Sequence, residues 1–289
     1  MYTLENDKFN SFHLDRNITS IFKQLEDFYE WSESVADERT KGWIMVNSVW
    51  TTIVIILCYY LTIWLLPKYM KNRSPFNLKI IMLVYNGLMV VVNSFIVVEL
   101  ALMSTKLNYS WTCQPITYVD ENAELRIAKA IWLYYMSKLV EFLDTIFFIL
   151  RKKDNQLTFL HVYHHSTMFL IIWLAIKYIP GGSAFLPILV NSFVHVVMYT
   201  YYALAIAYGN IFSKFRIYIT SIQMAQFLMG FILGTNAIFN GCQWPLWLRC
   251  VFLFYVITML ILFGDFYRKN YIKKASAREN EGGVDMKRI

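Results

Sequence analysis

The chain has 289 residues, of which 57% are hydrophobic and only 16% are charged, and its net charge is +7. Soluble domains carry about 25% charged residues, so this composition excludes an ordinary soluble protein. The basic residues are concentrated at the ends of long apolar runs, where they indicate membrane topology and not a nucleic-acid partner.

Seven apolar runs are long enough to cross about 30 Å of hydrocarbon as helices. They cover approximately residues 44–66, 80–103, 128–150, 157–179, 184–208, 217–239 and 246–266. Because the connections are short, we expect an all-α protein with one seven-helix membrane domain over residues 44–266. An N-terminal arm (1–43) precedes this domain and a basic tail (267–289) follows it.

The distribution of Lys and Arg orients these runs in the membrane. Both residues are denser in the connections 67–79, 151–156 and 209–216 and in the tail than in the alternate connections. The positive-inside rule therefore predicts a cytosolic C-terminus and a lumenal N-terminus.

The N-terminal arm contains the sequon Asn17-Ile18-Thr19, and the connection after the second run contains Asn108-Tyr109-Ser110. Both are predicted glycosylation sites, because both segments are expected in the lumen. Apolar residues with helical spacing also predict a short amphipathic helix on the membrane surface. These residues are Ile18, Ile21, Phe22, Leu25, Phe28 and Tyr29.

The third run carries three charges, Lys138, Glu141 and Asp144, at positions i, i+3 and i+6. Each would cost about 2.5–3.5 kcal/mol near the middle of the membrane, so we expect them to face the protein interior, with Lys138 paired to Glu141. The run ends at the basic segment 151–153, which is either a topology anchor or a binding site for phosphate groups. Its residues are Arg151, Lys152 and Lys153.

The fourth run contains three of the five histidines, His161, His164 and His165. Their spacing places the three imidazoles on one face of a helix, and polar groups inside a bilayer usually face a protein interior. The fifth and sixth runs each contribute one further polar stripe. The stripe residues are Asn191, His195, Tyr199, Tyr202, Gln223 and Gln226. Four runs thus place polar groups at overlapping depths, which predicts one interior cavity that opens to the cytosol.

Two chemistries fit the histidine cluster. The spacing His-x-x-His-His resembles a metal box of membrane desaturases and hydroxylases, which would make the protein a metal-dependent lipid oxidase. Those enzymes use about eight histidines in three boxes, and the first box is missing here. We therefore favour acyl transfer without a metal, because imidazole is both a nucleophile and a general base near neutral pH. A seven-helix transporter or receptor, with the polar stripes as a ligand site, is the alternative from another class.

The four cysteines are expected outside this cavity. Cys113 and Cys242 lie in connections predicted to be lumenal, where the oxidising environment favours a disulfide between them. Cys250 is the competing partner, but it begins the last run and we expect it to point into helix packing. Cys58 lies within the first run.

Four motifs in this order resemble those of the very-long-chain fatty acid elongases. They are Lys138-x-x-Glu141-x-x-Asp144-Thr145, His161-x-x-His164-His165, His195-x-x-Met198-Tyr199-x-Tyr201-Tyr202 and Thr220-x-x-Gln223-x-x-Gln226-Phe227. The resemblance implies a 3-oxoacyl-CoA synthase of the endoplasmic reticulum, which joins malonyl-CoA to a long acyl-CoA with loss of CO2. It also implies seven helices, six of which form a barrel around a narrow tunnel. The segments 126–129 and 138–145 are most similar to members that act on polyunsaturated chains.

The expected partners are the two CoA substrates, membrane lipid, the reductases and dehydratase of the elongation cycle, and a second copy of the chain in a homodimer. No cofactor is expected. His164 is expected to accept the acyl group, with His161 and His165 setting its tautomer and position. His195 and Asn191 are expected to stabilise an enolate, while Lys138, Glu141 and Asp144 set the electrostatics of the site. The expected substrate-binding residues are Arg151, Lys152, Lys153, Tyr199, Tyr202, Gln223 and Gln226.

Overall fold

The computed structural model describes residues 21–117 and 121–272, and this part of the chain is helical without any strand. The predicted glycosylation site at Asn17 and residues 273–289 of the predicted tail lie outside it. A short helix, α2 (Ile21–Ser34), covers most of the predicted amphipathic segment. Its placement on a membrane surface stays a prediction.

Six helices within the described residues are long and apolar enough to cross a membrane. They correspond to six of the seven predicted runs. A helix of 20 or more mainly apolar residues, at about 1.5 Å for each residue, reaches across the hydrocarbon layer. Their bounds are α3 (Val49–Met70), α4 (Lys79–Lys106), α7 (Phe159–Tyr178), α8 (Phe185–Tyr208), α9 (Arg216–Phe239) and α10 (Leu246–Tyr267).

The third predicted run differs from the expectation of one helix over residues 128–150. It is divided into α5 (Glu121–Val140) and α6 (Phe142–Leu150), with a break at Glu141. At the break the Asp144 N–H donates to the Glu141 carbonyl three residues back, at 3.1 Å, where an α-helix would reach four residues back. Because α5 contains five charged residues and α6 has only nine residues, neither counts as a span by length and composition. A seventh crossing therefore stays a prediction.

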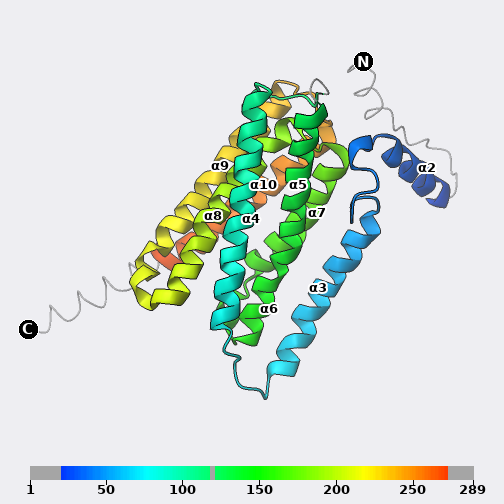
Figure 1. Cartoon of the computed structure of the whole chain (residues 1–289). Coiled ribbons are helices and arrows are strands. Elements are labelled where there is room, and N and C mark those ends of the chain that lie inside the picture. The colour runs from blue at the N-terminus through cyan, green and yellow to red at the C-terminus, as the bar shows by residue number, and fades with distance from the viewer. Residues whose placement is uncertain (1–20, 118–120, 273–289) are drawn as a thin grey trace, which may run out of the picture.

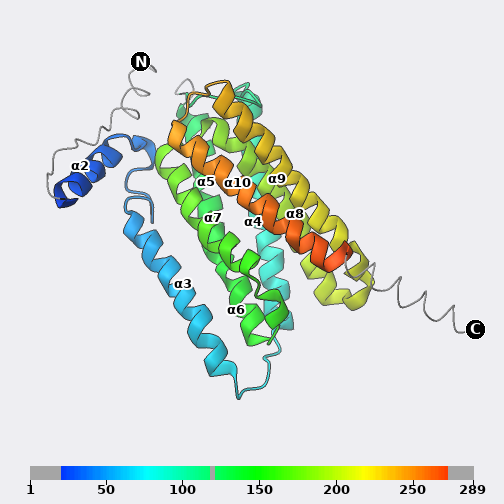
Figure 2. The same ribbon diagram turned by 180° about the vertical axis from the view of Figure 1, so that it is seen from behind.

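The long helices run side by side, and the connections gather at the two ends of the bundle (Figure 1). Short 3₁₀-helical segments occupy several connections, and a π-helical turn ends α10. They are η1 (Glu38–Thr40), η2 (Asp154–Gln156), η3 (Gly182–Ala184), η4 (Gly209–Phe215) and the π-helical turn η5 (Arg268–Ile272). The connections after α3, α6 and α8 lie at one end, and those after α4, α7 and α9 lie at the other (Figures 1 and 2). This alternation agrees with the predicted order of cytosolic and lumenal connections.

Packing between helices follows a closed order. α4 packs on α8, α8 on α9, α9 on α10, α10 on α7, α7 on α5, and α5 on α4. Helix α3 packs against α6 and α7 and stands beside the others (Figure 2).

A disulfide and backbone hydrogen bonds join the connections at one end. Cys113 is bonded to Cys242, with their Cα atoms 5.4 Å apart, which ties the α4–α5 connection to the α9–α10 connection. The backbone at Ser183 donates to the Gln114 carbonyl at 2.8 Å. Gly182 has a φ of 51°, and a Cβ there would lie 2.9 Å from the Gln114 carbonyl oxygen, so this approach requires glycine. Cys250 is exposed, and the expectation that it points into packing was wrong because it lies on the outward side of α10.

A buried carboxylate adds two hydrogen bonds at this end of the bundle. Glu124 on α5 accepts a hydrogen bond from the Tyr109 hydroxyl at 2.6 Å and another from Thr117. Burial and the adjacent Glu124 carboxylate raise the pKa of Tyr109 well above its usual value. Asn108, the second predicted glycosylation site, precedes this tyrosine and is exposed.

Candidate active site

The three histidines of α7 lie in the first two turns of that helix. The helix is capped by Thr158, whose side chain accepts a hydrogen bond from the backbone N–H of His161 at 3.2 Å. The ring centroids of His161 and His165 are 4.2 Å apart, and those of His164 and His165 are 5.3 Å apart. The spacing in the sequence therefore produces a continuous row of imidazoles, each of them half-buried.

A buried ion pair lies where α5 breaks. The Lys138 ammonium donates to Oε1 of Glu141 at 2.7 Å, as the i, i+3 spacing predicts. Nδ1 of His195 lies 3.1 Å from the same oxygen, so Glu141 joins α5 to α8. Both side chains are almost fully buried, so water solvates neither charge. Each charge is therefore compensated by the other within the bundle.

Asn191 extends this network by one turn of α8. Its Oδ1 accepts hydrogen bonds from the Tyr134 hydroxyl at 2.5 Å and from the Lys138 ammonium at 3.3 Å. With Oδ1 engaged twice, the amide nitrogen is the group left to donate to another molecule. No hydrogen bond from this nitrogen is found among the described residues.

The histidine row is connected to the broken helix by Thr145 of α6. Its hydroxyl lies 2.8 Å from Nε2 of His161. By contrast, no side-chain hydrogen bond holds the ring nitrogens of His164 or His165 within the part of the chain that the structure describes. Both ring nitrogens are therefore available in His164, the middle histidine of the motif in sequence, and in His165, whose ring lies between the other two.

Asp144 and Tyr199 form a second polar contact between the broken helix and α8. The Tyr199 hydroxyl donates to Oδ2 of Asp144 at 2.9 Å. Tyr202, one turn further along α8, is 37% exposed, and its ring centroid is 6.0 Å from that of Tyr199. Of these two tyrosines, only Tyr202 has a substantial exposed surface.

The two predicted glutamines of α9 have different environments. Gln223 donates from Nε2 to the Met198 sulfur at 3.3 Å, which links α9 to α8. Oε1 of Gln226 is buried without a hydrogen-bond partner in the described residues.

The basic segment 151–153 follows α6, at the end of the bundle opposite the disulfide. Arg151 contacts the Met82 sulfur at 3.2 Å, and Lys152 donates to the Lys71 carbonyl at 3.2 Å. Lys153 is exposed. Two of the three side chains therefore also hold the start of α4 and the end of α3 in place.

Tyr134 is a site residue that the sequence interpretation missed. It lies four residues before Lys138, and its ring centroid is 4.4 Å from the Lys138 ammonium. The i, i+4 spacing was the available signal, because it places both residues on the same face of α5.

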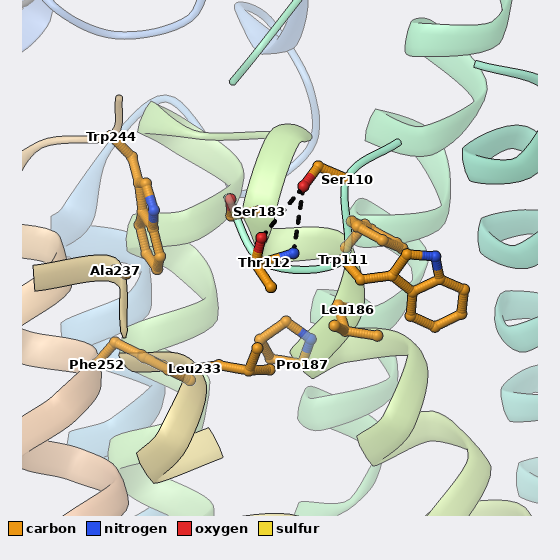
Figure 3. Close-up of a pocket in the computed structure, with 11 residues that line it drawn as sticks. Ser110, Trp111, Thr112, Ser183, Leu186, Pro187, Leu233, Ala237, Trp244 and Phe252 are labelled. Carbon is orange, nitrogen blue, oxygen red and sulfur yellow. Dashed lines mark hydrogen bonds between the residues drawn. The ribbon is translucent and has the colours of Figure 1, made fainter. Parts of the chain in front are cut away.

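A small hollow lies at the disulfide end of the bundle (Figure 3). Its wall is largely apolar and includes Trp111, Pro187, Leu233, Trp244 and Phe252. None of the predicted catalytic or substrate-binding residues lines it. Within the described residues, no group of three or more His, Cys, Asp or Glu side chains is arranged to hold a metal ion.

Comparison with known proteins identifies the family. Residues 44–279 match the family model described as ELO: GNS1/SUR4 family. The chain is 42% identical to very long chain fatty acid elongase 4 of Macaca mulatta over 257 residues, which are 88% of this chain and 82% of the relative.

Two other relatives give similar matches. Very long chain fatty acid elongase 2 of Mus musculus is 40% identical over 84% of this chain and 83% of its own. Very long chain fatty acid elongase 5 of Mus musculus is 36% identical over 93% of this chain and 88% of its own. The family model covers most of the chain, including the histidine row and the buried ion pair. The chain therefore belongs to the GNS1/SUR4 family of fatty acid elongases and is a multi-helix membrane protein of fatty acid elongation.

Proposed function

We propose that the protein is a 3-oxoacyl-CoA synthase that condenses malonyl-CoA with a long-chain acyl-CoA of the polyunsaturated or very-long-chain class. The products are 3-oxoacyl-CoA, CO2 and CoA. The observation that carries this proposal is the row of imidazoles beside the buried Lys138–Glu141–His195 network. It offers a nucleophile, and neither free cysteine, Cys58 or Cys250, competes for that role because both are exposed on the outside of the bundle.

In the first step, a ring nitrogen of His164 attacks the thioester carbonyl of the acyl-CoA. The C–S bond breaks and the CoA sulfur leaves with the electron pair, while the proton lost from the imidazole passes to the leaving group. The acyl-imidazole that forms is strongly electrophilic. Hydrogen bonds leave His164 and His165 as the two candidates, since Nε2 of His161 is engaged with Thr145 and Nδ1 of His195 with Glu141. Of these two we choose His164 because it is the middle histidine of the motif.

In the second step, malonyl-CoA loses CO2 and the electrons of the broken C–C bond form an enolate. Its carbon attacks the acyl group, the C–N bond to His164 breaks with its electron pair going to the ring nitrogen, and that nitrogen takes up a proton from water, which regenerates the imidazole. Asn191 supports this step, because its amide nitrogen is the free donor beside His195 and can stabilise the enolate oxygen. Lys138, Glu141 and Asp144 hold these groups in position, and no cofactor takes part.

The basic segment 151–153 would bind the CoA phosphates, and Tyr199, Tyr202, Gln223 and Gln226 would contact the substrates. We place the protein in the endoplasmic reticulum membrane with a lumenal N-terminus, where Asn17 and Asn108 can be glycosylated. The closed packing order of α4, α8, α9, α10, α7 and α5 supports a six-helix barrel around the acyl chain. The reductases and dehydratase of the elongation cycle would then act on the product.

Membrane vesicles that contain the protein, supplied with acyl-CoA and labelled malonyl-CoA, test the proposal by mass spectrometry of the products. The 3-oxoacyl-CoA product, two carbons longer than the substrate, should appear and should be lost in His164→Ala, at unchanged expression. Intact-mass analysis after incubation with acyl-CoA alone should show an acyl adduct on the wild type and none on the variant. Substantial turnover by the variant would rule out His164 as the nucleophile. Transport of acyl-CoA without any longer product would indicate a transporter.

A further inference from the structure

Helix α3 contributes two adjacent tyrosines to the region of the histidines, but only one of them leads to an imidazole. The Tyr59 hydroxyl lies 2.9 Å from Oγ1 of Thr145, which in turn lies 2.8 Å from Nε2 of His161. Tyr60 instead donates to Oγ of Ser166 at 2.8 Å. From this geometry we infer that Tyr59 is a positioning residue for His161 and acts through Thr145. The inference rests on the proposed function of the histidine row.

Both hydroxyl groups of this chain are shielded from water. Tyr59 is 5% exposed and Thr145 is fully buried. The Tyr59 ring is also stacked on Phe142, with centroids 4.3 Å apart and an interplanar angle of 14°. Removal of either hydroxyl breaks the hydrogen bond between them, and water does not replace the lost partner at such a buried position. The ring of Tyr59 would keep its place, since stacking and not the hydroxyl holds it.

Two proton arrangements use the single hydrogen of the Thr145 hydroxyl within the chain. In one form Tyr59 donates to Thr145, which donates to Nε2 of His161. In the other form the His161 Nε2–H donates to Thr145, which donates to Tyr59. In both forms Nε2 of His161 is engaged and cannot attack a thioester, so the chain holds this ring in one orientation.

The orientation of His161 matters for its neighbours in the row. Its ring is 4.2 Å from that of His165 and 5.0 Å from that of Phe148, measured between centroids. His165 in turn adjoins His164 at 5.3 Å. A rotation of His161 would therefore disturb the packing of the imidazole next to the proposed nucleophile. Helix α3 lies outside the closed packing order of the other six helices (Figure 1). The hydrogen bond between its Tyr59 and Thr145 makes it part of the site.

The matched pair Tyr59→Phe and Tyr60→Phe tests the inference, because each removes one hydroxyl that connects α3 to its neighbours. For Tyr59→Phe, kcat for condensation and the rate of acylation by acyl-CoA alone should fall about five- to ten-fold, as expected for one lost hydrogen bond. The KM for each substrate should stay within about two-fold, since Tyr59 is expected to contact neither substrate. Tyr60→Phe should leave kcat within about two-fold of the wild type.

Variants of Thr145 distinguish positioning from simple packing. Thr145→Val should lose as much activity as Tyr59→Phe, and the double variant should lose no more than either single variant, because all three break the same chain. Thr145→Ser keeps the hydroxyl and should recover most of the rate. If Thr145→Ser is as slow as Thr145→Val, the hydroxyl chain is not what matters and the inference fails.

A readout that does not depend on turnover separates this inference from the proposed function. Diethyl pyrocarbonate modifies unprotonated imidazole nitrogens, and peptide mapping gives the rate at His161. This rate should rise several-fold in Tyr59→Phe and stay unchanged in Tyr60→Phe. If the wild type forms no condensation product, the proposed function fails while this rate still decides the role of Tyr59. Wild-type modification rates and wild-type kcat in Tyr59→Phe would overturn the inference, as would an equal loss of activity in Tyr60→Phe.

Discussion

Neutralising Glu141 alone should destabilise the protein much more than removing the entire ion pair. Lys138 is 2% exposed and Glu141 is fully buried, so neither charge is compensated by water. In Glu141→Gln the ammonium keeps only neutral neighbours within hydrogen-bond distance, Oδ1 of Asn191 at 3.3 Å and Nδ1 of His195 at 3.5 Å. An uncompensated buried charge of this kind costs about 3–5 kcal/mol.

For a chain of this size, 1 kcal/mol changes Tm by about 2–4 °C, so Glu141→Gln should lower the apparent Tm by about 6–20 °C. The double variant Lys138→Met/Glu141→Gln removes both charges and preserves the side-chain volumes. Replacement of a buried pair by groups of similar size is often neutral or stabilising, so its Tm should be close to that of the wild type. Both variants are expected to lose activity, so stability is the informative quantity.

The assay is thermal unfolding of the purified protein in detergent at one fixed scan rate, because unfolding of such proteins is often irreversible. Asp265→Asn is the matched control. Its carboxylate pairs with Arg268 at 3.0 Å and Lys269 at 2.6 Å, but it is 39% exposed and water screens both pairs, so the substitution should change the apparent Tm very little. If Glu141→Gln is as stable as Asp265→Asn, or if the double variant is as unstable as the single one, the reasoning about the buried pair is refuted.

Two further predictions concern the ends of the bundle. Replacement of Arg151, Lys152 and Lys153 together by Gln should raise KM for acyl-CoA more than it lowers kcat, because these charges would act on a part of the substrate bound alike in ground and transition states. An unchanged KM would leave the segment as a topology anchor. Replacement of Cys113 and Cys242 by Ser should lower the apparent Tm, since a bridge over 129 positions contributes up to about 4–5 kcal/mol in the chain-entropy model. Peptide mapping without reductant should find the two residues linked in the wild type, and free thiols at both would contradict the bridge.

The parts of the site that follow from local spacing could be predicted from the sequence. The row of imidazoles on α7 and the pairing of Lys138 with Glu141 depend only on helical periodicity, which places residues three and four apart on one face. The six apolar spans follow in the same way from length and hydrophobicity.

The break at Glu141 was not predicted, and it lies where a residue that is distant in the sequence contacts the chain. An apolar run with three charges predicts one polar helix, and nothing within residues 128–150 shows that His195 on α8 also binds the Glu141 carboxylate. The role of Tyr59 was hidden for a related reason. Aromatic residues in a uniformly apolar run show no periodicity that distinguishes a lipid-facing side from a protein-facing side.

Two buried oxygen atoms of the site have no hydrogen-bond partner in the part of the chain that the structure describes. Oε1 of Glu141 accepts from two donors, while its Oε2 is buried without a partner among the described residues. Oε1 of Gln226 is in the same state. Each such atom costs about 1–3 kcal/mol in a folded protein. In the proposed function Gln226 contacts a substrate, and a donor group of that substrate would remove this cost at its Oε1.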